Sequence, residues 1–257
     1  MHNVHYSAKI GKNVKIGSYT VIKEDAEIGD NCIIGNNVVI HKDTKIGYNV
    51  RIDDNTVLGK LPMKAITSAT TEDKTLSPLS IGNECLIGAL TVIYRGASLE
   101  DKILVADQAS IREDVHIGEK TIVGAKVSIE NKCNIGKICK LELGSYITAF
   151  SDVGDFCFIA PMVSTSNDNY MGRDPERFKH FKGVTIKMGG RVGLNATILP
   201  GITINEEGQV AAGALVTRDV PSRKIVVGVP AKVWKDVPTE QLLENQPFYQ
   251  EFMRNRK

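Results

Sequence analysis

Aromatic side chains are scarce in this sequence of 257 residues: they make up 6 % of it, and there is a single Trp. A globule of this size usually contains more aromatic volume, so we expect a core of stacked aliphatic side chains. The net charge is only +2, and therefore nothing in it demands nucleic acid or an anionic membrane as a partner. The length is sufficient for one large domain or two small ones.

Long apolar runs are also missing. No stretch of the sequence approaches the ~20 apolar residues of a membrane span. The first residues, MHNVHYSAKIGKNV, lack the apolar centre of a signal peptide. We therefore expect a cytoplasmic protein.

The dominant feature of the sequence is a repeat of six residues. Successive segments from Ile10 read IGKNVK, IGSYTV, IKEDAE, IGDNCI and IGNNVV. An aliphatic residue occupies every sixth position from Val4 to Leu58, from Ile81 to Ile159 and from Ile186 to Val216, which gives 30 positions filled by Ile, Leu or Val. Four residues after each of them stands a small or β-branched residue.

This pattern resembles the hexapeptide repeat of left-handed parallel β-helices. Each hexapeptide would form one short strand and a turn, and three of them would form one triangular coil. Thirty repeats predict about ten coils, stacked ~4.8 Å apart, with each coil burying its aliphatic residues against the next. The predicted fold is an all-β, left-handed parallel β-helix over residues 1–237.

The cysteines fit this interpretation because all five occupy the small inward position: Cys32, Cys85, Cys133, Cys139 and Cys157. Redox or metal chemistry would require a CxxC or Cys/His ligand spacing, and neither occurs. We therefore interpret them as small buried hydrophobic residues. Cys139 and Cys157 should stack on each other, and a reducing cytosol would keep them as thiols.

Two insertions interrupt the repeat, at residues 59–80 and 164–185. Insertions in solenoids form loops that leave the stack, often on the binding face. Residues 238–257 are predicted to form a short helix, beginning near Pro238, that caps the last coil. Since the outer faces of a solenoid carry apolar patches, we expect it to oligomerise, with loops of one subunit reaching the next.

Several segments resemble a known family. LPGITINEEGQVAAGALVTRDVP and VVGVPAKV are similar to segments of hexapeptide acyltransferases that use acyl-coenzyme A. YRGASLEDKILVADQASIRE and SNDNYMGRDPERFKHFKG resemble the nucleotide-sugar N-acetyltransferases of surface-polysaccharide synthesis, such as lipopolysaccharide or S-layer glycan. Among these, the enzymes that act on dTDP-3-amino-3,6-dideoxyhexoses match most closely, and the resemblance covers essentially the whole chain.

The resemblance implies transfer of an acyl group to a sugar amine. The donor would be acetyl-CoA, or another acyl-CoA, and the reaction would use no metal. The resemblance also implies a homotrimer with active sites at the subunit boundaries, where the coenzyme lies between two subunits. Two departures from the family are Val229, where many relatives have Asn, and the more basic segment 222–224.

Outward positions can be compared between coils because residues 18 apart stack. One column contains Tyr94, Arg112, Glu130 and Thr148. The ring of Tyr94 could contact the base of a nucleotide sugar, and the guanidinium of Arg112 could bind its pyrophosphate. The alternative is an ordinary surface ladder in which Arg112 pairs with Glu130. Arg95 and Asp107 lie nearby on the same coils.

A second column contains Ala106, Gly124, Glu142 and Ala160, so that one carboxylate is surrounded by small residues. It could orient a sugar ammonium or hydroxyl, or it could simply be solvated. We assign Glu142, Glu130 and Asp107 as orienting or charge-stabilising groups. His180 is a candidate base, a coenzyme contact or a packing residue.

The remaining candidates divide between the two substrates. In the second insertion, we expect Asn167, Asp168, Asn169 and Tyr170 at the sugar end, and the cationic part, residues 173–182, to face coenzyme phosphates or the adjacent subunit. The small residues Ala212 and Gly213 are expected to accommodate the pantetheine arm. The other predicted coenzyme contacts are Asn195, Arg218, Arg223, Lys224 and Lys232.

Competing interpretations concern other uses of the same fold. A γ-type carbonic anhydrase needs three His ligands on zinc, and the five histidines show no such spacing. A hexapeptide O-acetyltransferase would favour a His base and so make His180 essential. A non-enzymatic β-helix scaffold would explain the repeat but not the two chemically rich insertions. The sequence does not decide which sugar epimer is used or which position carries the amine. It also does not decide between a dTDP and a UDP sugar, or between acetyl and a longer acyl group.

Overall fold

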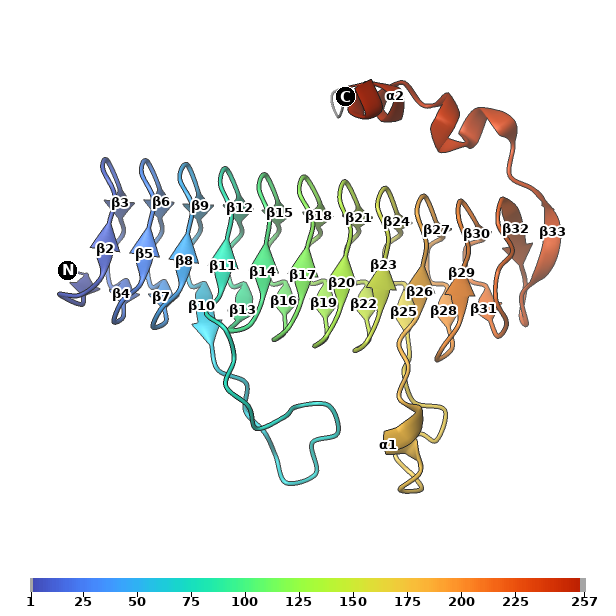
Figure 1. Ribbon diagram of the computed structural model, residues 1–257, viewed down its shortest axis with the longest axis horizontal. Coiled ribbons are helices and arrows are strands. Elements are labelled where there is room, and N and C mark those ends of the chain that lie inside the picture. Colours follow the sequence, from blue (N-terminus) through green and yellow to red (C-terminus); the bar gives the residue numbers. More distant parts are fainter. Residues whose placement is uncertain (1, 255–257) are drawn as a thin grey trace.

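The computed structural model describes residues 2–254, most of which form a left-handed parallel β-helix, so that the chain is nearly all-β (Figure 1). Its strands are two to five residues long and alternate along the chain between three sheets, which we call A, B and C. The predicted fold class is thereby confirmed.

Sheet A contains β1 (Asn3–Val4), β4 (Val21–Ile22), β7 (Val39–Ile40), β10 (Val57–Lys60), β13 (Val92–Tyr94), β16 (Ser110–Ile111), β19 (Ser128–Ile129), β22 (Tyr146–Ile147), β25 (Ser164–Thr165), β28 (Thr197–Ile198) and β31 (Leu215–Val216). Sheet B contains β2 (Lys9–Ile10), β5 (Glu27–Ile28), β8 (Lys45–Ile46), β11 (Ser80–Ile81), β14 (Ser98–Leu99), β17 (His116–Ile117), β20 (Asn134–Ile135), β23 (Asp152–Val153), β26 (Thr185–Ile186) and β29 (Thr203–Ile204). Sheet C contains β3 (Lys15–Ile16), β6 (Ile33–Ile34), β9 (Arg51–Ile52), β12 (Leu86–Ile87), β15 (Leu104–Val105), β18 (Ile122–Val123), β21 (Lys140–Leu141), β24 (Phe158–Ile159), β27 (Arg191–Val192), β30 (Gln209–Val210), β32 (Lys224–Val227) and β33 (Lys232–Asp236).

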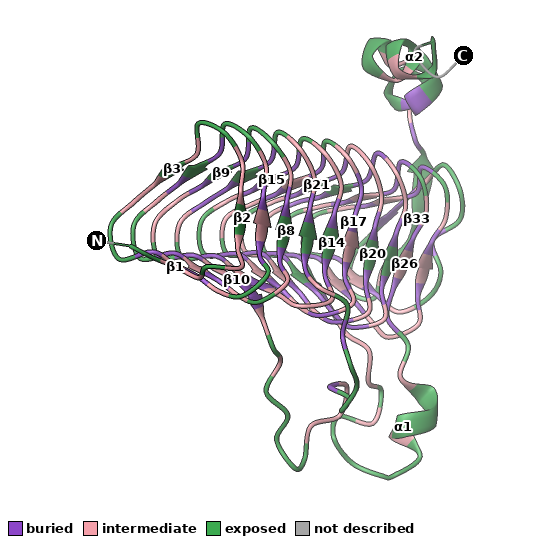
Figure 2. Ribbon diagram, turned by 60° about the vertical axis from the view of Figure 1, so that its left-hand side comes forward, coloured by how far each residue is buried: buried purple, intermediate pink, exposed green. Residues whose placement is uncertain are grey.

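The stacking register follows the repeat. Ile93 pairs with Ile111 and Ile111 with Ile129, so each coil has the expected 18 residues. The register survives both insertions, since Leu58 pairs with Ile93 and Val153 with Ile186. The chain turns between sheets at three edges, which we call the A–B, B–C and C–A edges, and Figure 2 shows the triangular cross-section that results.

The interior is filled by the repeating aliphatic residues, of which Ile93, Ile111 and Ile129 have no exposed surface. Burying one such side chain contributes roughly 1.5–3 kcal/mol, so the stack is stabilised along its whole length. At the turns, residues such as Asn31 (φ 58°) and Asn49 (φ 54°) adopt the left-handed conformation, which Asn tolerates better than most residues.

All five cysteines are buried free thiols, as the sequence predicts. Burial raises the pKa of Cys85 to about 11 and that of Cys133 to about 12. The neighbouring Cys139 thiol, together with burial, raises the pKa of Cys157. This contact agrees with the predicted stacking of Cys139 on Cys157.

Both insertions leave the solenoid at the A–B edge. The first insertion spans residues 61–79, between β10 and β11, and the second spans residues 166–184, between β25 and β26. The second contains the short helix α1 (Arg177–His180). Figure 1 shows both insertions projecting from the same side of the solenoid.

The C-terminal segment differs from the expected cap. In place of a helix from Pro238, the chain forms η1 (Thr239–Gln241), η2 (Leu243–Asn245) and then α2 (Pro247–Arg254). We call residues 237–254 the strap, because they fold back beside earlier coils (Figure 1). The antiparallel pair β32–β33 lies at the end of sheet C instead.

Aromatic contacts explain the course of the strap. The ring of Phe156, on the B–C edge, lies 5.1 Å from each of the rings of Tyr249 and Phe252. The Leu243 backbone N–H donates to the Glu207 carboxylate at 2.8 Å. Burying these apolar side chains is more favourable than leaving the strap extended beyond the last coil. Within residues 2–254, no helix is long and apolar enough to cross a membrane.

Candidate functional site

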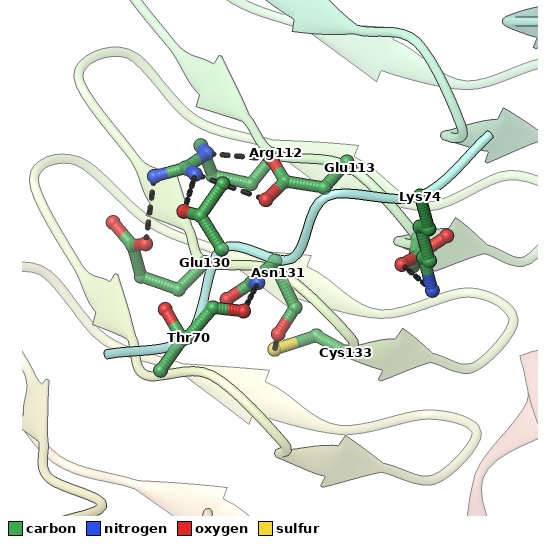
Figure 3. A network of polar contacts seen from close by, with 9 residues as sticks. Thr70, Lys74, Arg112, Glu113, Glu130, Asn131 and Cys133 are labelled. Atoms are coloured by element: carbon green, nitrogen blue, oxygen red, sulfur yellow. Dashed lines mark hydrogen bonds and ion pairs between the residues drawn. The ribbon is translucent and has the colours of Figure 1, made fainter. Parts of the chain in front are cut away.

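The A–B edge holds the first predicted column, and the first insertion lies across it. The Arg112 Nη2 group donates to Oγ1 of Thr71 at 3.0 Å, and Nδ2 of Asn131 donates to the backbone oxygen of Thr70 at 2.7 Å. Lys74 forms an ion pair with Asp114 at 2.8 Å. These contacts fix the insertion against two successive coils (Figure 3).

Arg95 also holds the first insertion in place. Its Nε donates to the backbone oxygen of Leu76 at 3.1 Å, its Nη1 to that of Lys42 at 2.9 Å, and its Nη2 to Asp43 at 3.1 Å. Arg95 was predicted to bind substrate, but its guanidinium is occupied by these partners. Its contacts are those of a residue that anchors the insertion to the solenoid.

Arg112 is the centre of a polar network on the same edge. Its Nε and Nη2 bind the Glu113 carboxylate at 2.8 and 3.0 Å, and its Nη1 lies 3.4 Å from Oε2 of Glu130 (Figure 3). The guanidinium also lies over the ring of Tyr94, 5.1 Å from its centre. Each guanidinium nitrogen thus has a partner within the chain, as in the alternative surface ladder, and Glu113 is almost completely buried.

Glu130 is the acidic group that this network leaves partly accessible, with 26 % of its side chain exposed. Burial raises the pKa of Glu130, the nearby Glu113 charge adds to this, and Arg112 opposes it in part. A carboxyl group with a raised pKa beside loops that leave the scaffold is a candidate for proton transfer.

Tyr146 was not predicted, yet it belongs to the same region. Burial raises the pKa of its phenol, and the Glu130 carboxylate raises it further. The sequence does contain a signal: in its outward column of sheet A, Tyr146 is an aromatic residue whose nearest neighbours are Ser110 and Ser128 on one side and Ser164 on the other. Thr148, expected to face outward beside it, is instead buried, and its backbone N–H donates to Oγ1 of Thr165 at 2.8 Å.

Glu142 lies on the other side of sheet A, at the C–A edge, because it follows β21 rather than a strand of sheet A. Its carboxylate has no polar partner among residues 2–254. The structure therefore separates Glu142 from Glu130 within one chain. Glu142 shares its edge with the predicted coenzyme contacts Asn195, Ala212 and Gly213, which lie on later coils, with Ala212 and Gly213 exposed.

Asp107 has a structural partner instead of an open site. Its Oδ1 accepts the backbone N–H of Ala89 at 2.9 Å. Asp101 and Asp155 accept a backbone N–H from the preceding coil in the same way, at 2.7 and 2.8 Å. Asp107 thus belongs to a repeated brace between coils.

The second insertion is organised by Asp168. Its carboxylate accepts the N–H groups of Tyr170 at 2.8 Å and Gly172 at 3.0 Å, and it lies 3.2 Å from Arg177. Burial acts to raise the pKa of Asp168, but the two N–H groups and Arg177 outweigh it and lower the pKa. Asp168 therefore shapes the loop, while Asn169 is exposed and the backbone oxygen of Asn167 accepts the N–H of Lys182.

His180 stacks on Tyr170, with ring centres 5.8 Å apart, and is exposed. Two of the predicted coenzyme cations have partners of their own: Arg223 lies 2.9 Å from Glu244, and Lys224 binds Asp236. Arg218 and Lys232 are exposed. Within residues 2–254, no group of three or more His, Cys, Asp or Glu side chains is arranged to hold a metal ion.

A shallow pocket of about 430 Å³ adjoins the A–B edge on the side of sheet B. It is lined by Lys74 from the first insertion and by His116, Lys132 and Phe150 from the solenoid, among others. The Lys132 ammonium lies 5.1 Å from the centre of the Phe150 ring. The pocket thus combines cationic and aromatic groups.

Comparisons with known proteins agree with this architecture. The family model "Bacterial transferase hexapeptide (six repeats)" matches residues 7–42, and "Hexapeptide repeat of succinyl-transferase" matches residues 78–106. A UDP-N-acetylglucosamine acyltransferase from Campylobacter jejuni superposes with a TM-score of 0.56 at 16 % identity, covering 99 % of this chain and 81 % of that one. The Arabidopsis enzyme of the same name has a TM-score of 0.57 at 16 % identity, covering 98 % and 77 %. These two structures share the fold.

Among relatives in sequence, the bifunctional protein GlmU of Geobacillus thermodenitrificans is 28 % identical over 197 residues, which cover 63 % of this chain and 42 % of that protein. The chain thus spans about two fifths of the length of this relative. A protein of Schizosaccharomyces pombe, whose name describes it as an acetyltransferase, is 41 % identical over 165 residues, covering 60 % of this chain and 73 % of that protein. The chain belongs to the hexapeptide-repeat transferase family.

Proposed function

We propose that the protein transfers an acyl group, acetyl in the simplest case, from acyl-CoA to the amine of a nucleotide-linked amino-deoxysugar. The substrate we propose is a dTDP-3-amino-3,6-dideoxyhexose. The observation that carries the proposal is Glu130, a half-buried carboxyl group with a raised pKa at the edge where both insertions leave the solenoid. The names of two relatives support acetyl transfer, one from Schizosaccharomyces pombe and one an N-acetyltransferase of Enterococcus faecalis that is 48 % identical over 46 residues.

The chemistry requires one proton acceptor. The amine nitrogen attacks the thioester carbonyl carbon, the carbon–sulfur bond breaks, and the nitrogen loses a proton. A carboxylate with a raised pKa is a stronger base than an ordinary one, so we assign the proton to Glu130. Arg112 acts through Glu130 by holding its carboxylate in place. The proton then passes to the departing sulfur, and Glu130 returns to its ionised form.

The nucleotide end of the substrate would lie in the pocket beside the A–B edge. Lys74 and Lys132 would face the phosphates there, although each now pairs with an acidic side chain. Phe150 would offer an aromatic face to a base. Tyr146, near Glu130, would contact the sugar. Asn167 to Tyr170 of the second insertion would close this end of the site.

The acyl-CoA arm would lie along the C–A edge, against the small residues Ala211, Ala212 and Gly213. Exposed apolar side chains flank this edge, among them Met162 and Leu194. Sheet A separates this edge from Glu130 within one chain, so a site that uses both edges has to be formed between two subunits. This separation supports the proposed homotrimer.

Acyl transfer is tested by thiol release from acetyl-CoA with a panel of dTDP- and UDP-linked amino sugars. The matched control is the corresponding sugar with a hydroxyl in place of the amine. We expect release with the dTDP-3-amino sugar and none with the hydroxyl compound. Release with the hydroxyl compound alone would establish the O-acyltransferase, and no release with any acceptor would favour a scaffold.

A further inference from the structure

A cavity of about 650 Å³ lies between the strap and the outer face of sheet C, away from both edges used above. Its wall includes Ile138, Phe156 and Phe158 from the solenoid, and Leu243 and Phe248 from the strap. A volume of this size is typical of small-molecule sites, which are mostly apolar with a few placed polar groups. Lys140 and Glu240 also belong to the lining.

Arg191 is a half-buried cation in the lining of this cavity. It comes from β27, and its Nη1 donates to Oε1 of Gln241 in the strap at 3.1 Å. Its Nη2 is buried and has no hydrogen-bond partner among residues 2–254. Burial lowers the pKa of Arg191, and Glu207 opposes this only in part. An unpaired donor on a buried charged group is costly.

Gln209 has a matching unpaired group. It pairs with Arg191 in the register of β27 and β30, so the two side chains are neighbours on the outer face of sheet C. Its Oε1 is buried and unpartnered within the described chain. The oxygen and nitrogen of a Gln amide are assigned from their partners. A half-turn of this amide would present its NH2 group, so that two donors could face one anion.

Ile138 supplies an independent observation. The B–C edge places a residue of positive φ in each turn, and earlier coils use polar residues such as Asn31 (58°) and Lys120 (58°). Ile138 adopts φ 55°, and within residues 2–254 no other β-branched residue has a positive φ. Such a conformation is strained for Ile. The strain is tolerated where the side chain forms an apolar wall of the cavity.

We propose that this cavity binds a small molecule with an apolar or aromatic body and a single anionic head group. The head group pairs with Nη2 of Arg191, and the body lies against Ile138, Phe156 and Phe158. The strap covers the bound molecule and contributes Gln241, which orients the guanidinium. Such a molecule fits both the shape and the charge of the cavity, because its anionic group supplies the hydrogen-bond acceptor that Nη2 of Arg191 lacks. This inference does not depend on the proposed acyl transfer.

The test uses 1-anilinonaphthalene-8-sulfonate, an aromatic probe with one anionic group, titrated into the full chain and followed by fluorescence. We expect one saturable site per chain. Arg191→Gln should weaken binding by about tenfold to a hundredfold, the range for a charged hydrogen bond. The matched control is Arg51→Gln, on the same face of sheet C, because Arg51 is exposed and pairs with Asp53. It should leave the affinity unchanged.

Two further measurements keep the result decisive. Octanoate should displace the probe at a concentration about tenfold lower than octanol does, because only octanoate has the anionic head. Ile138→Asn should weaken probe binding while the melting temperature holds or rises, since Asn tolerates this backbone conformation. If Arg191→Gln does not fold, Arg191→Lys keeps the cation and should retain binding. Equal displacement by octanol, or unchanged affinity in a folded Arg191→Gln, would overturn the proposal.

Discussion

Oε2 of Glu130 lies 3.4 Å from Nη1 of Arg112, while the other side of the same guanidinium binds the buried Glu113. Arg112 therefore binds two carboxylates that differ in exposure, since that of Glu113 is buried and that of Glu130 is partly exposed. The arrangement makes Arg112 a positioning residue for Glu130.

Replacing Arg112 should change the pH dependence of turnover. In Arg112→Gln the cation that lowers the pKa of Glu130 is lost, so the pKa of Glu130 rises further and the acid limb of the kcat profile moves to higher pH. Arg112→Lys keeps the charge but loses the fork geometry. It should lower kcat while leaving the acid limb in place. Identical profiles for the two variants would mean that Arg112 only supports the fold.

The stability difference between Glu130→Gln and the parent should change with pH in one direction. The folded-state pKa of Glu130 is raised from its usual 4.5, so its stabilising contribution is present below that value and is lost as pH rises through the folded pKa. The melting temperature of Glu130→Gln should therefore rise relative to the parent between about pH 4 and about pH 7, at fixed protein concentration.

Glu100→Gln is a control for which we expect the opposite change of relative stability with pH. Burial acts to raise the pKa of Glu100, but the Glu119 N–H and Lys137 outweigh it and lower the pKa. Its contribution is present above the usual value and is lost as pH falls. The parent should therefore be more stable than Glu100→Gln above about pH 5, and should lose this advantage as the pH falls below about 4.5. A common direction for both variants would contradict the assigned environments.

The cysteines should be unreactive in the folded protein. A pKa of about 11 for Cys85 and about 12 for Cys133 leaves roughly one thiol in a thousand or fewer as thiolate at about pH 8. Iodoacetamide labelling followed by mass spectrometry should modify the five thiols only after unfolding. Rapid labelling of any one of them in the native state would show an opening that the fold does not contain.

Ala212→Trp tests the coenzyme edge. A bulky ring on the exposed turn at Ala212 should block an arm that lies against it, and should raise the acyl-CoA KM strongly while the protein stays folded and keeps the assembly state of the parent. Exposure of Ala212 means that the ring costs little stability. Lys235→Trp, on the exposed β33, is the matched control. Unchanged acyl-CoA kinetics in folded Ala212→Trp would place the coenzyme elsewhere.

The fold was predictable because the same six-residue pattern, with an aliphatic residue at every sixth position, is repeated in every coil. The period of the aliphatic residues sets the register, so Ile93 and Ile111 had to stack, and the cysteines had to face inward. The insertions could be located because they interrupt that period. Their course could not, since it depends on contacts far apart in sequence, such as Arg112 with Thr71 and Asn131 with Thr70.

The candidate site was predictable only in part for the same reason. Column counting placed Tyr94, Arg112 and Glu130 together, but not the partners that occupy the guanidinium. It also placed Glu142 in a separate column, but it did not show that this column shares an edge with Asn195 and Ala212. The path of the strap depends on the ring contacts of Phe156, which no periodicity reveals.

The most direct test compares Glu130→Gln with Glu142→Gln in single-turnover thiol release, using acetyl-CoA and a dTDP-3-amino-3,6-dideoxyhexose. Both variants remove one carboxylate, from opposite edges of sheet A, so each controls for the other. Glu130→Gln should slow transfer by about 10²–10⁴-fold, the usual contribution of general acid–base catalysis, while Glu142→Gln loses less. Full activity of folded Glu130→Gln would show that Glu130 does not take the proton.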